Sequence, residues 1–185
     1  NGTLDIASLS VATSSSGITG TYSAPRGTTT IAGRPSFLKN FGTFIHNSGT
    51  VNFTDNSSSN INEHANCVDT TFYNLTHTPP SNDELTFRMY TNYTIEGTLT
   101  NAGTDGDIRF ATYSADKTIT FGTSSTAGAI VNSSATSSII EFSGNTTYQT
   151  TLAAANSLYP FTVTGTDIEW DSGSVAASVE TNASS

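Results

Sequence analysis

Charged side chains, cysteine and long apolar runs are all scarce in this sequence. Charged residues make up 11% of the 185 positions, and fifteen Asp and Glu against six Lys and Arg leave a net charge of −9. Nucleic-acid binding needs basic side chains that neutralise phosphates, so this balance argues against a nucleic-acid partner. The apolar runs are too short to cross a bilayer, and we expect no membrane span. The single cysteine, Cys67, excludes a disulfide within the chain.

Sequence signatures of catalysis and metal binding are also missing. The three histidines, His46, His64 and His77, lack the spacing of metal ligands, and exposed imidazoles are expected. No Gly-x-Ser-x-Gly elbow supports a catalytic triad, and no glycine-rich phosphate loop is present. We therefore predict a protein that is not an enzyme, with no catalytic residue, no cofactor and no metal.

One acidic segment is a candidate for polysaccharide cleavage. Asp167, Glu169 and Asp171 alternate along an expected strand, and paired carboxylates carry out glycoside hydrolysis. Trp170, however, would lie on the opposite face and could not serve as their sugar platform. A solvated acidic face is the better interpretation.

A second acidic segment is a candidate for calcium binding. Asp105-Gly106-Asp107 is an oxygen-rich turn, and Asp83 and Glu84 are expected to lie near it. The complete calcium-loop patterns are absent. We interpret 105–107 as an ordinary turn.

The feature that organises the chain is a repeat. The segment 20–31, GTYSAPRGTTTI, recurs as GTFIHNSGTVNF over 42–53, with Gly, Thr, Gly and Thr at four identical positions. Self-similarity at a fixed short period is typical of a solenoid, and the residues are β-formers. The glycines fit tight corners or close backbone approaches.

The same spacing predicts three apolar columns inside the solenoid, whose members are expected to stack in successive turns. The first column comprises Ile31, Phe53, Leu75, Gly97, Ile119, Ile140 and Phe161. The second comprises Thr29, Val51, Tyr73 and Ile95, and the third Leu99, Phe121, Phe142 and Val163. The prediction is an all-β, single-stranded right-handed parallel β-helix with coils of about 21–22 residues.

The length fits one domain, which we divide into three parts. Residues 1–19 form an irregular N-terminal segment, either a first coil or a strand that docks on another subunit. Residues 20–175 form the β-solenoid, in which 56–66 is expected to bulge from a corner, and 176–185 a tail or cap. Because the chain opens at Asn1, we expect a removed leader or a longer product.

Four segments resemble the repeats of a known class of proteins. These are GTYSAPRGTTTI (20–31), FGTFIHNSGTVNF (41–53), TTFYNLTHT (70–78) and YTIEGTLT (93–100). They are similar to repeats of right-handed parallel β-helix structural and fibre proteins of marine bacteriophages, notably cyanophages, and of related environmental surface proteins. The resemblance covers roughly 20–100, and the segments 34–40 and 82–90 depart from it. It implies a virion or extracellular fibre and supplies no catalytic residues.

Asn-x-Ser/Thr sequons suggest an extracellular protein. Eight occur among sixteen Asn, a mild excess over what such a Ser- and Thr-rich chain would produce by chance. The candidate glycosylation sites are Asn52, Asn56, Asn74, Asn92, Asn132 and Asn145. Asn52 and Asn74 are expected to face outward at the same position of successive coils.

Two functional classes remain. The first is a structural subunit of an extracellular, cell-surface or virion fibre, whose partners are copies of itself that stack end to end. The alternative is a tailspike-like or adhesin module that binds or cleaves surface polysaccharide, with host glycans as partners.

Overall fold

A computed structural model describes the parts of the chain that form regular coils. These are residues 2–11, 20–32, 38–54, 59–61, 67–79, 83–102, 106–112, 117–123, 128–132, 140–142, 147–150, 162–165 and 168–170. Every regular element among them is a β-strand, and every strand pairing is parallel.

The strands form four parallel sheets, which we label A to D. Sheet A contains β1 (Leu4–Ile6), β4 (Thr28–Ile31), β7 (Thr50–Phe53), β10 (Asn74–His77), β13 (Thr98–Asn101), β16 (Ala129–Asn132) and β19 (Thr162–Gly165). Sheet B contains β2 (Leu9–Val11), β5 (Leu38–Asn40), β8 (Ser59–Ile61), β11 (Asp83–Met89), β14 (Gly106–Thr112), β17 (Ile140–Phe142) and β20 (Ile168–Trp170). Sheet C pairs β3 (Thr21–Ser23) with β6 (Thr43–Ile45), and sheet D contains β9 (Thr70–Phe72), β12 (Tyr93–Ile95), β15 (Thr118–Phe121) and β18 (Thr147–Thr150).

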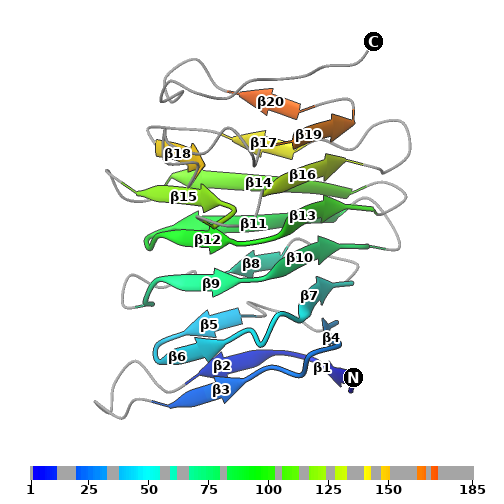
Figure 1. Ribbon diagram of the computed structural model, residues 1–185, viewed down its shortest axis with the longest axis vertical. Helices are drawn as coiled ribbons and strands as arrows, with labels where there is room; N and C mark the ends of the chain where they lie inside the picture. The colour runs from blue at the N-terminus through cyan, green and yellow to red at the C-terminus, as the bar shows by residue number, and fades with distance from the viewer. Residues whose placement is uncertain are drawn as a thin grey trace.

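The chain visits the sheets in a fixed cycle and so winds into a β-solenoid. Within each sheet a strand pairs with the strand three places later in the sequence, as in the series β4, β7, β10 and β13. Figure 1 shows the coils stacked along the long axis, with β1 at one end and β20 at the other. The nearer strands run to the right and the far strands of sheet B to the left as the chain rises, which is a right-handed winding (Figure 1). The predicted fold class, a right-handed parallel β-helix, is confirmed, whereas the predicted coil length is not.

Alternation of side chains produces the interior. In β4, β7, β10 and β13 every second residue is buried, and the residues between them are half-buried on the outer face. Val51, Leu75 and Leu99 therefore stack in register within sheet A. Across the interior, the rings of Phe87 and Phe110 stack with centroids 4.4 Å apart, beside Tyr93. Burial of these apolar columns supplies the main stabilising free energy of the fold.

The predicted period holds only at the first repeat. Thr29 pairs with Val51 and Ile31 with Phe53, as the repeat of 20–31 in 42–53 predicts. The partner of Val51 is then Leu75 rather than Tyr73, and the partner of Leu99 is Ile130 rather than Phe121. These later coils are longer than the predicted period. Because the corners change in length from coil to coil, a constant spacing cannot stay in register.

The first predicted column is therefore wrong beyond its first two members. Leu75 stacks on Val51 rather than on Phe53, Ile119 belongs to sheet D, and Ile140 to sheet B. Phe161 lies outside the described residues.

The second and third columns fail in the same way. Tyr73 lies at a corner, and Ile95 is in sheet D. Of the third column, Leu99 and Val163 are in sheet A, Phe121 is in sheet D and Phe142 in sheet B. Continuous apolar columns do exist, but they connect other residues.

Two segments without clear periodicity belong to the solenoid. β1 pairs with β4 and β2 with β5, so the described part of 1–19 is a first coil, one of the two alternatives considered. The segment 56–66, expected to bulge, contains β8, and Ile61 of this strand is fully buried. The expected bulge is wrong for 59–61, because this strand contributes one apolar residue to the core; 56–58 and 62–66 lie outside the described residues.

Glycine is required where backbones of adjacent coils touch. A Cβ added at Gly42 would overlap the carbonyl oxygen of Gly20 in the coil below. We expect Gly42→Ala to lower the free energy of unfolding by about 2 kcal/mol, because the coils must separate to admit the methyl group. Gly2→Ala is the matched control, since a Cβ there meets nothing within 4 Å. Urea unfolding of both variants measures the difference, and equal stabilities would contradict the close contact.

Candidate functional site

In each coil the chain turns a corner where it passes from sheet C or D into sheet A. The last residue of this corner is glycine in all but one of the coils from β4 to β16. The residues that directly precede β4, β7, β10, β13 and β16 are Gly27, Gly49, Tyr73, Gly97 and Gly128. Their following residues are in register, so these five positions stack from coil to coil. Tyr73 is therefore a large aromatic residue at a position that is glycine in the neighbouring coils.

Steric contacts explain the glycines. A Cβ at Gly49 would overlap the carbonyl oxygen of Pro25, and one at Gly97 would overlap Oδ1 of Asn74. Tyr73 is accommodated because it alone connects β9 to β10. In the coil below, residues 46–49 make the same connection, and Asn47 and Ser48 adopt positive φ angles of 48° and 57°. The corner therefore becomes abruptly shorter at Tyr73.

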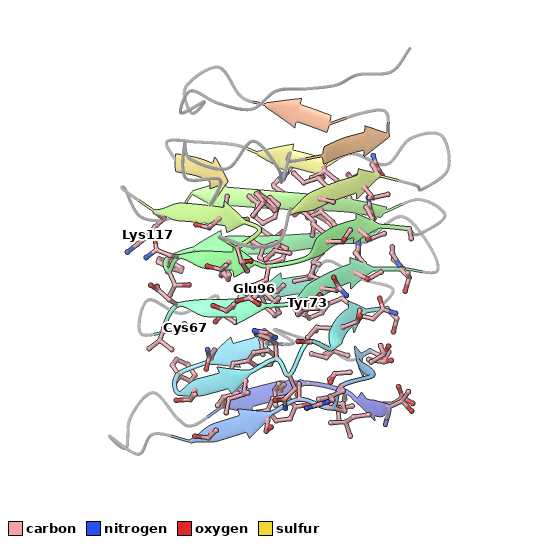
Figure 2. The ribbon with its side chains drawn as sticks, in the orientation of Figure 1. Cys67, Tyr73, Glu96 and Lys117 are labelled. Atoms are coloured by element: carbon pink, nitrogen blue, oxygen red, sulfur yellow. The ribbon has the colours of Figure 1, made fainter. Side chains whose placement is uncertain are left out.

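A partly exposed cluster forms where the corner shortens, and it consists of His46, Tyr73 and Glu96 from three successive coils. The His46 and Tyr73 rings stack with centroids 5.9 Å apart and an interplanar angle of 19°. His46 Nε2 lies 3.4 Å from Glu96 Oε2, and the two side chains are 22% and 29% exposed. Figure 2 labels Tyr73 and Glu96 beside each other on the near side of the solenoid.

A backbone contact sets the orientation of the imidazole. The amide N–H of Ser48 donates a hydrogen bond of 3.0 Å to His46 Nδ1. Nδ1 is thus an acceptor, and in the neutral ring the proton is on Nε2, which faces the Glu96 carboxylate. Glu96 therefore takes up the imidazole donor, and the cluster offers a polar ligand the Tyr73 ring and the remaining acceptor positions of the carboxylate.

The outer face of sheet A lies next to this cluster and is uncharged. Its ten outward positions from β4 to β16 are all half-buried. They are Thr28, Thr30, Thr50, Asn52, Asn74, Thr76, Thr98, Thr100, Ala129 and Val131. Eight of the ten carry a hydroxyl or an amide, in a chain whose net charge is −9.

Hydrogen bonds hold the two asparagines of this face. Asn52 Oδ1 accepts a hydrogen bond of 3.0 Å from the Thr78 hydroxyl, and Asn74 Oδ1 accepts one of 3.0 Å from the backbone N–H of Thr98. Each bond connects one coil to the next. The amide groups are therefore fixed on the face.

The acidic candidates that the structure describes lie on sheet B. Gly106 and Asp107 begin strand β14, so the predicted turn at 105–107 is wrong for these two residues; Asp105 lies outside the described residues. The expected proximity to Glu84 is confirmed, because Glu84 and Asp107 are register partners. Glu84 Oε2 lies 3.1 Å from Arg109 Nη1. This carboxylate therefore forms an ion pair with a guanidinium, which disfavours a role as a calcium ligand.

The acidic segment considered for polysaccharide cleavage, 167–171, is only partly described. Glu169 belongs to β20 and is in register with Glu141, which is in register with Arg109. Asp167 and Asp171 lie outside the described residues. Among the residues that the structure describes, no group of three or more His, Cys, Asp or Glu could hold a metal ion.

His77 departs from the expected exposed imidazole. It is 2% exposed and is in register with Phe53 on one side and Asn101 on the other. Asn132 continues this interior column, which changes from apolar to polar along the solenoid. The sequence shows the residue types, but only the register reveals that they stack inside.

The surroundings of His77 disfavour its charged form. Its Nδ1 is buried and makes no hydrogen bond within the described part of the chain, while Asn101 Nδ2 donates to the carbonyl of Gly106. Burial lowers the pKa of His77 to about 4, and the neighbouring Asn101 side chain acts in the opposite direction as the smaller effect.

The predicted sequons differ in accessibility. Asn52 and Asn74 face outward between buried neighbours, but Asn52 is in register with Thr76 and Asn74 with Thr50, so they do not stack on each other as expected. Asn92 is at the surface, where its Nδ2 donates to Asp69. Asn132 is only 8% exposed, which disfavours a glycan on the folded chain, and its glycosylation stays a prediction. Asn56 and Asn145 lie outside the described residues.

Comparison with protein-family models, with curated proteins and with solved structures gives no match for this chain. The resemblance to bacteriophage fibre repeats therefore stays a prediction. The described residues include no helix of the length and hydropathy that spanning a membrane requires.

Proposed function

We propose that the chain is a non-enzymatic structural subunit of an extracellular or virion fibre, in which copies stack end to end. The observation that carries the proposal is the continuous parallel ladder. Sheets A and B each keep one strand order from β1 and β2 to β19 and β20. A second copy placed on the same axis can extend both ladders without a change of geometry.

The N-terminal end of the solenoid provides the contact surface. β1 and β2 are the outermost strands of their sheets, so one side of each has backbone groups that no described strand pairs. Ile6 and Leu9 pack against the core but are only partly buried. A contact between this end and the opposite end of another copy does not close on itself, and it produces a filament.

Electrostatics sets the conditions for assembly. Copies with a net charge of −9 repel each other, and salt screens this repulsion. We therefore expect longer assemblies at higher ionic strength and higher protein concentration.

Sedimentation velocity and negative-stain microscopy test the proposal. The purified chain should form rods whose length increases with concentration, and Ile6→Lys should abolish them by placing a charge at the contact end. Thr43→Lys is the matched control, because Thr43 is exposed on the side of the solenoid. A chain that stays monomeric at all concentrations and salt levels, or rods that Ile6→Lys leaves unchanged, would contradict end-to-end stacking.

The carboxylates at the surface support a non-catalytic role over polysaccharide cleavage. Glycoside hydrolysis uses two carboxyl groups that flank one bond. Glu96 contacts an imidazole, and Glu84 contacts a guanidinium. Each of these two carboxylates is thus paired with a basic side chain of the same chain.

A further inference from the structure

We propose that the uncharged outer face of sheet A, together with the corner at Tyr73, binds an uncharged linear polysaccharide laid along the solenoid axis. The site lies on a side of the solenoid, and the proposed stacking uses its ends. The two proposals can therefore fail independently.

The first argument is Tyr73 itself. Four of the five stacked corner positions are glycine, and Tyr73 places a half-buried ring at the remaining one. The ring packs on His46 rather than in the core. A sugar ring stacks its C–H face on an aromatic surface, and such surfaces are effective when they are held rigidly. The parallel ladder on both sides of Tyr73 provides that rigidity.

The second argument is the repeat of polar groups beside Tyr73. Thr50, Asn74 and Thr98 directly follow the corner in three successive coils. Neighbouring strands are about 4.8 Å apart, so a hydroxyl or amide recurs at about that interval along the axis. One pyranose unit of an extended polysaccharide has a similar length. Each unit can therefore meet an equivalent hydrogen-bonding group.

The third argument is charge. The ten outward positions from β4 to β16 include no charged residue, although the chain contains fifteen Asp and Glu. Glu96 at the edge is already paired with His46. An anionic polysaccharide would find no basic partner on this face, whereas a neutral one loses no charge solvation on binding.

The size of the face argues against a second copy of the chain as the occupant. Five rungs that are about 4.8 Å apart, each about 13 Å wide, give roughly 300 Å². A stable protein interface buries about 800 Å² on each partner. A single sugar chain is narrower than a protein surface, so a long narrow face is large enough to hold it.

Isothermal titration calorimetry tests the proposal with four hexasaccharides. Cellohexaose, chitohexaose and maltohexaose are uncharged, and an alginate hexamer is anionic. We expect at least one uncharged probe to bind and alginate not to bind. Tyr73→Gly should weaken binding at least fivefold, because it removes the ring and restores the glycine of the neighbouring coils. Thr98→Val, which keeps the shape and removes the hydroxyl, should weaken it about threefold.

Thr21→Val is the matched control for Thr98→Val, because Thr21 is exposed on sheet C away from the Tyr73 corner and should not affect binding. Circular dichroism checks that each variant keeps the β-solenoid. Binding of alginate alone, equal affinities of Tyr73→Gly and the parent chain, or no binding of any uncharged probe at millimolar concentration would each overturn the proposal.

Discussion

Phe87→Ala is expected to lower the free energy of unfolding by about 4 kcal/mol. Phe87 is fully buried, stacks on Phe110 with centroids 4.4 Å apart and meets Tyr93 edge to face at 5.3 Å. Truncation removes apolar contacts and leaves a cavity where sheets B and D meet. In a solenoid each coil is stabilised by its neighbours, so a cavity in a middle coil weakens both halves.

Urea unfolding followed by circular dichroism measures this loss. Phe87→Leu keeps most of the volume and should cost clearly less than Phe87→Ala. Ile45→Ala serves as an exposed control and should change stability by less than about 0.5 kcal/mol. If Phe87→Ala cost no more than Ile45→Ala, the ring could not lie in a close-packed interior.

Acidification is expected to destabilise the protein through His77. Its pKa in the folded chain is about 4, below the ordinary value of 6.5. The unfolded chain therefore binds a proton first as the pH falls, and protonation favours unfolding. Above pH 6.5 the effect is absent; it grows between pH 6.5 and 4 and is complete near pH 4. A shift of this size corresponds to about 3 kcal/mol.

Comparison with His77→Phe isolates this contribution from the carboxylates that also titrate. Phe fits the column, since its register neighbour on β7 is Phe53. The parent chain should lose about 3 kcal/mol more stability than His77→Phe between pH 7 and pH 4, measured by urea unfolding at each pH. Identical pH profiles of the two proteins would show that the imidazole of His77 is accessible to protons in the folded state.

The sequence was informative where its pattern is local. The repeat of 20–31 in 42–53 predicts a parallel stack of these two segments, and the register of Thr28–Ile31 with Thr50–Phe53 confirms it. Alternation of apolar residues with Thr and Asn predicts which side chains face outward in β7, β10 and β13, and it is confirmed there. Both signals act over a short stretch of chain, where strand geometry alone determines the outcome.

The candidate site could not be predicted from the sequence in the same way. Tyr73 looks like another member of an apolar column, and Glu96 and His46 are far apart in the sequence. They meet because the corner spans 46–49 in one coil and Tyr73 alone in the next. This change in corner length means that residues a fixed number of positions apart no longer stack in the later coils. The burial of His77 and Asn132 was missed for the same reason, since it depends on the register that accumulates from all preceding corners.

By itself, then, the sequence determined that this chain forms stacked parallel β-coils with an outer surface of threonine and asparagine. The tertiary structure decided which residues share a column, which histidine is buried and where an aromatic ring interrupts the glycine corner. The physical reason is that alternation and corner sterics are local properties. Contacts between coils depend instead on the sum of corner lengths, which no single segment encodes.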